Sequence, residues 1–305
     1  MKSLRNILSA LSLLAVAGSL SAQQPAARVD SSATAVDYMV EIYRKENIPS
    51  KEPIPYTYVR EADVMYEKTV WRVVDLREKQ NLPLYYPTQP IGGRVNLIDL
   101  LLKGVENGEI TPYDPFDDYN EFSRKISLAE VNVNLGVKAG GDTLWVDDGE
   151  GNMVAQITKT TERRTDQVTK LWVKEKIIFD KKRSVLERRV IGICPRRYYT
   201  KGGGSVADDD EAAAEMLSTP IMWIYMPEAR KVLSRHPIFS RFNDAQNISF
   251  DDFFMQNRYA GNIYKVSNVY NNRTIEEYAS GLDRLYEAQR IQNEIFDFEQ
   301  DLWEY

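Results

Sequence analysis

The chain has very few of the side chains that carry most metal and nucleophilic chemistry. Its 305 residues include one cysteine, Cys194, and one histidine, His236. A conventional zinc site needs several thiolate or imidazole ligands, so two candidates in the whole chain exclude one. An internal disulfide is excluded because it needs two cysteines. Cys194 ends the apolar, strand-like run RRVIGIC, which predicts a buried thiol without a partner.

Catalytic and cofactor motifs are also missing. His236 stands before Pro237, and no Ser, Cys or Asp is singled out as its partner, so we expect a packing or surface residue. The glycine run at Gly202 lacks the Lys-Ser/Thr of a phosphate-binding loop. DDGEGN, from Asp147, lacks the spaced ligands and late glutamate of a calcium loop and predicts a hairpin turn. We therefore expect no cofactor and no metal, and we find no motif that indicates an enzyme.

Long apolar runs are missing beyond the first residues. The opening MKSLRNILSALSLLAVAGSLSAQQ has a basic start, an apolar run over 7–17 and small residues up to Ala22. This order predicts a secretory signal peptide, residues 1–22. The run is shorter than the roughly 20 apolar residues that a membrane-spanning helix needs. We expect an exported protein without direct membrane insertion.

A basic surface stripe is missing too. Removing Lys2 and Arg5 with the signal peptide leaves 37 of the 39 basic residues against 45 acidic ones, a formal charge of −8. Nucleic acids are bound by clustered lysines and arginines, and the short runs at Lys181 and Glu187 are typical of solvated strand faces. We expect no nucleic-acid partner.

The rest of the chain divides into a leader and one large domain. Residues 23–55 predict a flexible leader, a short amphipathic helix over 35–47 and an extended arm. Pro53 and Pro55 keep the arm from being helical, and we expect it to pack on some other surface. Residues 56–305 form the expected α+β domain.

Two stretches of this domain share a pattern. NLIDLLLKGVENGEI begins at Asn96, and SFDDFFMQNRYAGNI begins 153 residues later at Ser249. Each opens on a helix-capping residue, continues with an apolar stripe and reaches a glycine, Gly108 or Gly261, after 12 residues. The spacing predicts two helices and similar positions for the isoleucines that follow them. Chance similarity between two amphipathic helices is the alternative.

The similarity extends upstream and suggests an internal duplication. Residues at offsets of 152 to 154 match across the two copies: Trp71 with Trp223, Arg77 with Arg230, and Pro83 with Pro237. The predicted repeat units span about 60–125 and 215–270. Periodicity leaves open whether residues 60–80 form a helix or a helix followed by a strand.

The region between the units, about 128–196, is rich in strands. TLWVDD and NMVAQITKTT flank one turn, and KLWVKEKIIFD and VLERRVIGI flank another, which predicts two antiparallel hairpins. A capping box from Thr274 to Glu277 predicts the start of a long final helix. The expected fold class is α+β: two related helix-containing units joined by antiparallel β-hairpins, with a long C-terminal helix.

Aromatic residues are abundant and lie among Asp, Asn and Arg. The chain has 18 Tyr, 10 Phe and 5 Trp, gathered in stretches such as LPLYYP and DDFFMQNRY. Such clusters suit protein–protein interfaces, sugar stacking or the core. A periplasmic glycan-binding module and a carboxylate-based glycosidase are therefore alternative functions, the second because a glycosidase needs only two suitably placed acids.

Three long stretches resemble the GldN/PorN family. They are READVMYEKTVWRVVDLREKQNLPLYYP from Arg60, MWIYMPEARKVLSRHPIFSRFNDAQNISFDDFF from Met222, and GLDRLYEAQRIQNEIFDFEQDLWEY from Gly281. The resemblance runs from about Tyr56 to Tyr305 and identifies the large domain as GldN-like.

The resemblance implies a structural role in type IX secretion and gliding motility. Members of this family form a periplasmic ring with an outer-membrane lipoprotein, GldK/PorK, on the inner face of the outer membrane. The implied partners are that lipoprotein, copies of the chain itself, and the periplasmic part of a motor protein of the GldM/PorM type. From residue type we nominate six partner-interface candidates: Trp71, Arg77, Tyr85, Tyr86, Trp223 and Arg230.

Overall fold

The computed structural model describes most of the domain. All the described residues lie in one compact unit, Lys45–Tyr305. These are 50–91, 93–117, 120–137, 142–147, 153–158, 163, 165–200, 216–240, 243, 246 and 248–302. The predicted signal peptide, the helix over 35–47 and the glycine run at Gly202 lie outside them. No helix among the described residues is long and apolar enough to cross a membrane.

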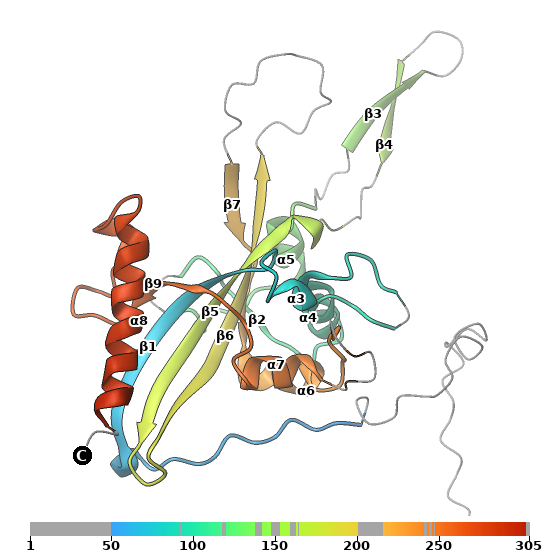
Figure 1. Cartoon of the computed structure of the whole chain (residues 1–305). Coiled ribbons are helices and arrows are strands. Elements are labelled where there is room, and N and C mark those ends of the chain that lie inside the picture. The colour runs from blue at the N-terminus through green and yellow to red at the C-terminus, as the bar shows by residue number, and fades with distance from the viewer. Residues whose placement is uncertain are drawn as a thin grey trace, which may run out of the picture. The chain divides into compact units, whose positions relative to one another are not determined.

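The centre of the fold is an antiparallel sheet (Figure 1). Its strands run in the order β2-β8-β6-β5-β1-β9, and β7 pairs with β6. Their bounds are β1 Val64–Asp75, β2 Pro112–Tyr113, β5 Val168–Asp180, β6 Val185–Thr200, β7 Met216–Pro220, β8 Trp223–Tyr225 and β9 Asn262–Val266. A separate hairpin joins β3 Asp142–Asp147 to β4 Met153–Thr158. Both predicted hairpins, β3–β4 and β5–β6, are confirmed.

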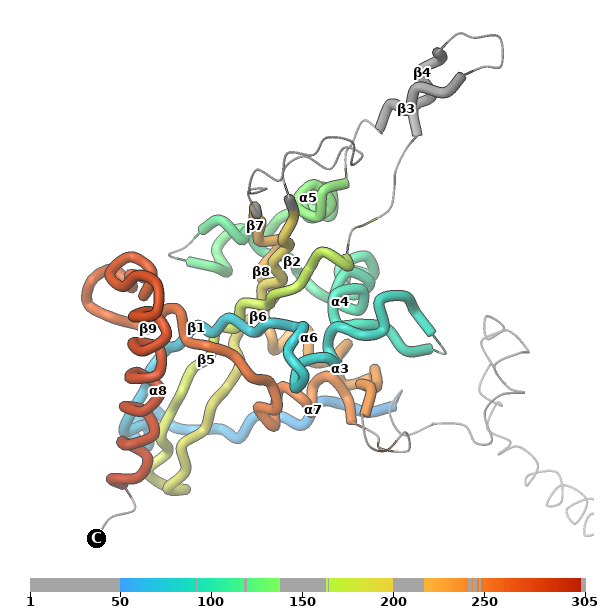
Figure 2. Tube along the Cα trace, turned by 45° about the horizontal axis from the view of Figure 1, so that its top comes forward, coloured from blue at the N-terminus to red at the C-terminus, as the bar shows by residue number. Residues whose placement is uncertain are grey.

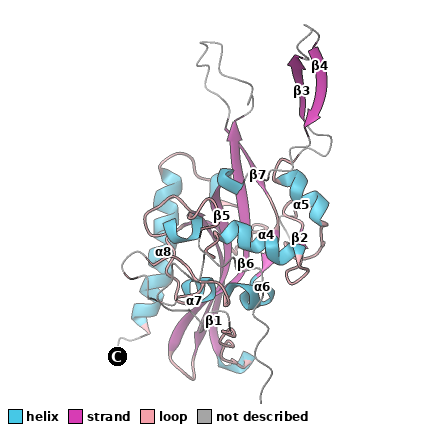
Figure 3. Ribbon diagram, turned by 90° about the vertical axis from the view of Figure 1, so that its right-hand side faces the viewer, coloured by secondary structure: helices cyan, strands magenta, loops and turns pink. Residues whose placement is uncertain are grey.

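The helices are short except for the last one. They are α3 Leu82–Tyr85, α4 Leu97–Glu106, α5 Leu128–Asn134, α6 Met226–Leu233, α7 Phe250–Met255 and α8 Asp283–Asp301, with single 3-10 turns at Glu61–Asp63, Thr165–Gln167 and Ile275–Glu277. Figure 3 shows them around the strands. The model thus confirms an α+β fold with a long C-terminal helix.

Residues 60–80 form one turn of 3-10 helix and then strand β1. The strand lies between β5 and β9, and in the stretch that β9 covers, residues 70–73, side chains on both faces are buried. Burial on both faces hides the alternation that marks a half-exposed strand. This is why periodicity could not separate strand from helix here.

One face of the sheet carries two apolar clusters. Val70 and Val74 are four residues apart on β1, so they point to the same face. Val74 belongs to the larger cluster, which also contains buried residues of α4, α6 and α7. Val70 belongs to the smaller cluster, with residues of β9 and α8. Figures 1 and 2 show α8 beside β1 and β9, apart from α6 and α7.

A buried polar cluster separates the two apolar ones. Arg72, between Val70 and Val74, donates from Nε to Glu175 Oε2 at 2.9 Å and from Nη2 to Gln292 Oε1 at 2.6 Å. Tyr259 Oη donates to Glu175 Oε1 at 2.7 Å. Burial raises the pKa of Tyr259 well above its usual value, so the phenol is the proton donor. The cluster therefore connects β1, β5, α8 and the segment after α7.

The opposite face of the sheet has its own aromatic cluster. Trp71, Cys194 and Trp223 are buried together there. Trp71 donates from Nε1 to Glu121 Oε1 at 2.8 Å. Cys194 is a buried free thiol, and burial raises its pKa to about 12, so the prediction of a buried thiol is confirmed.

Both predicted helix starts are confirmed. The Asn96 side chain accepts a hydrogen bond from the Asp99 amide at 2.7 Å and caps α4. Ser249 accepts one from the Asp252 amide at 3.2 Å and caps α7. Gly108, with φ of +73°, follows α4 in the left-handed conformation that was predicted for it.

The predicted role of Gly261 as a helix end is wrong. α7 ends at Met255, and Asn257 adopts the left-handed conformation with φ of +50°. Gly261 instead lies against β1, where a Cβ would stand 2.8 Å from the Val73 carbonyl oxygen. The glycine is needed for close packing between two backbones.

The internal duplication stays a prediction. In the strand order, β1 and β2 of the first predicted unit take places that mirror those of β8 and β9 of the second, on either side of β5 and β6. However, β1 has 12 residues and β8 has three. Ile110 lies in the larger apolar cluster and Ile263 in the smaller one.

Two predicted boundaries change. The capping box of Thr274 and Glu277 is present, but it opens the 3-10 turn Ile275–Glu277, and α8 begins only at Asp283. Gly281, with φ of +59°, lies between the two elements. The region assigned to hairpins begins with α5, which Ser127 and Glu130 cap.

Candidate functional site

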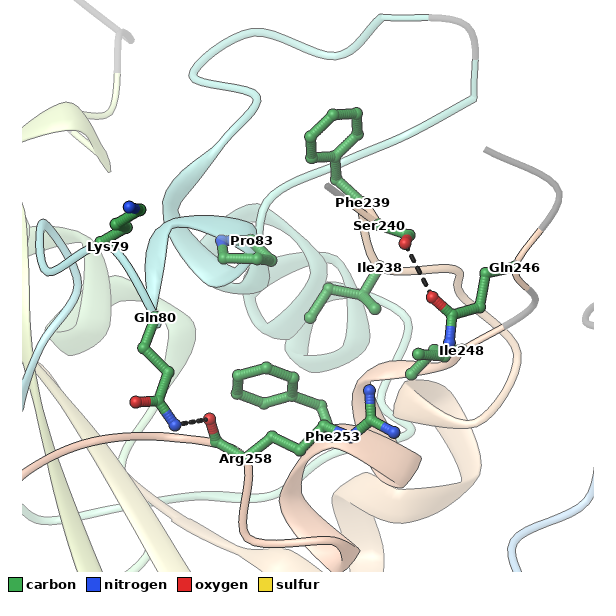
Figure 4. A pocket seen from close by; sticks show the side chains of 10 residues that line it. All are labelled: Lys79, Gln80, Pro83, Ile238, Phe239, Ser240, Gln246, Ile248, Phe253 and Arg258. Carbon is green, nitrogen blue, oxygen red and sulfur yellow. Dashed lines mark hydrogen bonds between the residues drawn. The ribbon is translucent and has the colours of Figure 1, made fainter. Parts of the chain in front are cut away.

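The clearest candidate site is an apolar groove. Among the described residues no group of three or more His, Cys, Asp or Glu side chains could hold a metal ion. The groove, of about 570 Å³, lies where α3, α7 and the segment that leads into α7 meet. Figure 4 shows its lining: Lys79, Gln80, Pro83, Ile238, Phe239, Ser240, Gln246, Ile248, Phe253 and Arg258.

Short polar contacts fix the walls of the groove. Gln80 donates from Nε2 to the Arg258 carbonyl at 2.7 Å, which ties the turn before α3 to the turn after α7. Ser240 donates from Oγ to Gln246 Oε1 at 2.8 Å and closes the loop on the other side (Figure 4). The groove is therefore a formed feature of the fold.

The lining has apolar side chains and positive charge. Pro83, Ile248 and Phe253 supply apolar surface, and Lys79 and Arg258 are exposed cations on the same lining. The lining contains no Asp or Glu among the described residues. Such a surface suits a protein segment with an apolar anchor and acidic neighbours better than it suits catalysis.

The arm before β1 packs on the domain; the sequence predicted packing but not the surface. Ser234 donates from Oγ to the Lys51 carbonyl at 3.0 Å, and Lys51 forms an ion pair with Asp252 of α7. The Tyr56 ring lies under two guanidinium groups, 4.4 Å from that of Arg230 and 5.1 Å from that of Arg189. Burial raises the pKa of Tyr56. The arm is thus held on α6, α7 and β6.

Three of the six interface candidates lie inside the protein. Trp71 is 5% exposed and Trp223 3% exposed, both in the aromatic cluster of the sheet. Arg230 is 5% exposed; its Nε donates to Asp251 Oδ1 at 2.8 Å and a second nitrogen donates to the Ile54 carbonyl. In the folded chain these side chains support the structure and offer almost no surface to a partner.

The other three candidates lie together at the surface near α3. Tyr86 is 50% exposed and makes an edge-on ring contact with Tyr85 at 5.0 Å. Tyr85 donates from Oη to the Asp166 carbonyl at 2.9 Å. Arg77 is exposed, with a nitrogen 3.8 Å from Asp75. These three stay candidates for direct contact.

Sequence reasoning missed the groove itself. Phe239, Phe253 and Arg258 come from a segment that was treated only as the second repeat, and Lys79 and Pro83 come from the first. The only available signal was that both stretches carry aromatic residues next to arginines. Their meeting depends on how α3 packs beside α7, which local patterns do not encode.

Comparison with known proteins gives the family. No curated protein matches the chain. The family model described as gliding motility associated protein GldN matches residues 59–304. This match covers the whole sheet and all the described helices. The chain therefore belongs to the GldN family, which is associated with gliding motility.

Proposed function

We propose that this chain is a non-enzymatic structural subunit of a periplasmic ring. In this proposal it assembles with copies of itself and with an outer-membrane lipoprotein of the GldK/PorK type, and it serves type IX secretion and, in bacteria that glide, motility. The single observation that carries the proposal is the family match over residues 59–304.

The architecture supports a subunit that binds more than one neighbour. A closed ring needs a heterologous contact, in which two unlike surfaces of the same chain meet. The domain offers an apolar, basic groove beside α3 and α7, and exposed apolar residues such as Leu282, Leu285 and Tyr286 at the start of α8. Two related units with different surfaces would be one way to produce such unlike surfaces.

The direct test is assembly with the lipoprotein. The chain and a lipoprotein of the GldK/PorK type are expressed together, purified through a tag on the lipoprotein and examined by native mass spectrometry. We expect a stoichiometric complex with many copies of both proteins. A chain that stays monomeric and ignores the lipoprotein, and whose deletion leaves secretion intact, would contradict the proposal.

A matched pair of variants links the groove to assembly. Phe239→Asp places an acid on the exposed rim of the groove, whereas Phe116→Asp makes the same change at an exposed phenylalanine that does not line it. We expect only Phe239→Asp to weaken the complex. Specific binding to purified peptidoglycan in place of the lipoprotein would favour the glycan-binding alternative.

A further inference from the structure

A second hollow, of about 480 Å³, opens on the face of the sheet opposite α4 and α7. Trp172 of β5 is paired in register with Cys194 of β6, and Cys194 belongs to the aromatic cluster on that face. Arg196, two residues further along β6, points the same way. Trp172, Arg196 and Tyr264 line one side, and the loop from Tyr270 to Glu277 lines the other.

A β-bulge builds the aromatic side of the hollow. Arg72 pairs with Ile263 and Trp71 pairs with Lys265, which leaves Tyr264 as an extra residue in β9. A bulge turns neighbouring side chains toward the same face. The Tyr264 ring therefore stacks on Trp172 with centroids 5.1 Å apart, and Lys265 lies 4.8 Å from the centre of the Trp71 ring.

Side-chain hydrogen bonds hold the loop in place. Asn268 donates to the Val266 and Arg273 carbonyls, each at 3.1 Å. The Asn268 amide in turn donates to Asn272 Oδ1 at 3.0 Å. Asn271 and Asn272 both have positive φ, 55° and 56°, the left-handed conformation that asparagine adopts more readily than most other non-glycine residues. These hydrogen bonds fix the conformation of the loop in the absence of a ligand.

Two guanidinium groups face this hollow without an acceptor. Arg196 lies 4.1 Å from the centre of the Trp172 ring, and Arg273 lies 4.6 Å from each of the Tyr270 and Tyr278 rings. Neither side chain donates a hydrogen bond or forms an ion pair within the part of the chain that the structure describes. A guanidinium stacked on a ring keeps its N–H edges free for an oxygen in its own plane.

Both glutamates of the lining interact with residues other than Arg196 and Arg273. Glu276 pairs with Arg284 of α8 at 2.5 Å. Glu277 accepts from the amide and the hydroxyl of Thr274, both at 3.0 Å, as part of the capping box. The amide hydrogen bond, first among several causes, lowers the pKa of Glu277, so it is a carboxylate committed to the loop. Neither acid forms an ion pair with Arg196 or Arg273 among the described residues, although the charge of Arg273 also contributes to the lowered pKa of Glu277.

We propose that this hollow binds a carboxylate of an acidic segment of a partner protein, through Arg196 and Arg273. A planar carboxylate can accept two parallel N–H bonds from one guanidinium, which no neutral group can match. The rim favours a protein segment over a free ion, because Tyr270 and Tyr278 are exposed and lie beside Arg273. Clustered Tyr, Trp and Arg are typical of the residues that dominate protein–protein affinity.

The test measures binding of an acidic peptide to the mature chain. A fluorescein-labelled peptide of alternating Glu and Gly is titrated at low ionic strength, with a Gln–Gly peptide as the uncharged control, and fluorescence anisotropy gives Kd. We expect Arg196→Gln and Arg273→Gln each to raise Kd at least about tenfold, the typical effect of losing a charge-assisted hydrogen bond. Arg235→Gln, at an exposed arginine after α6, is the matched control and leaves Kd unchanged.

A change of opposite sign sharpens the test. Glu276→Gln removes a negative charge from the lining. Because that charge repels a bound carboxylate, we expect the variant to lower Kd about two- to threefold. The proposal is overturned if both arginine variants keep the wild-type Kd while circular dichroism shows them folded. It is also overturned if inorganic phosphate binds at the hollow but the acidic peptide does not, since the occupant would then be a small free anion. None of these outcomes depends on whether the ring forms.

Discussion

Arg72 and Glu175 show how a single buried pair organises this domain. Their side chains are 7% and 0% exposed, and Tyr259 and Gln292 complete the hydrogen bonding. Burying two charges is unfavourable unless each finds partners, so the pair mainly fixes which elements meet. Here it joins the sheet to α8 and to the segment after α7, between two apolar clusters.

Removing one member of this pair should be far more harmful than losing a surface pair. Glu175→Gln leaves the Arg72 charge buried without its counterion, and we expect a loss of about 3–5 kcal/mol in the free energy of unfolding. Glu67→Gln breaks the exposed pair with Lys176 and should cost less than about 1 kcal/mol. Urea unfolding followed by circular dichroism measures both. Equal losses in the two variants would show that the buried pair has no special role.

The Cys194 thiol should make stability depend on pH in the alkaline range. Burial raises its pKa from about 9 to about 12, so the folded state holds the proton more tightly than the unfolded state. The stabilisation from this group is complete below pH 9 and is lost as pH rises from 9 to 12, at about 1.4 kcal/mol per pH unit. Between pH 8 and pH 10 the free energy of unfolding of Cys194→Ala should therefore fall less than that of the wild type.

The same burial predicts slow chemistry at the thiol. A bulky thiol reagent should label Cys194 at least about a hundredfold more slowly in the native protein than in denaturant, because labelling requires opening of the sheet. The rate is followed by mass spectrometry at pH 8. Rapid labelling of the native chain would contradict the buried position and would make an intermolecular disulfide possible.

At the scale of elements, Gly108 and Gly261 occupy matching positions in the sequence pattern but have different structural roles. Gly108→Ala puts a side chain at φ of +73° in open space and should cost about 1 kcal/mol. Gly261→Ala forces a Cβ to within 2.8 Å of the Val73 carbonyl oxygen, so β9 must separate from β1, and we expect a loss of more than about 2 kcal/mol. Thermal unfolding of the two variants compares them. Equal losses would mean that the backbone at Gly261 shifts freely.

The elements also show what sequence can predict. The caps Asn96 and Ser249 and the hairpin turn between Asp180 and Val185 follow from local chemistry, and all three are present. The start of α8 was missed because Thr274 and Glu277 satisfy a local rule for helix starts, whereas the turn they open ends at Glu277 and α8 begins only after Gly281. Local rules give the beginning of a helical turn but not its length, which depends on packing.

At the scale of the whole molecule, the candidate sites were the least predictable feature. Residue type nominated Trp71, Trp223 and Arg230, since such residues are common at interfaces, but these residues are equally suited to a core. Whether such a residue lies in the core or at the surface depends on the packing of the sheet, which places both tryptophans in one buried cluster on a single face. The groove and the hollow each join residues more than 90 positions apart in the chain, so no window of sequence contains them.

The surface and buried candidates should separate in a single set of variants. Trp71→Ala and Trp223→Ala remove large buried rings, and Trp71 also loses its hydrogen bond to Glu121, so we expect losses of about 3–5 kcal/mol in stability. Arg77→Ala and Tyr86→Ala alter exposed side chains and should leave the unfolding transition within about 0.5 kcal/mol of the wild type.

If the patch near α3 contacts the lipoprotein or a second copy of the chain, the two exposed variants should nevertheless fail to co-purify in the assembly. Loss of a Tyr or Arg from the centre of an interface typically costs about 2 kcal/mol or more in binding, which is roughly a 30-fold loss in affinity. Tyr58→Ala, at an exposed tyrosine of the arm, is the matched control and should assemble normally. Normal assembly of both Arg77→Ala and Tyr86→Ala would exclude the surface near α3 as the contact. The groove beside α7 would then be the next surface to test. Phe239→Asp tests it independently, because neither Arg77 nor Tyr86 lines the groove.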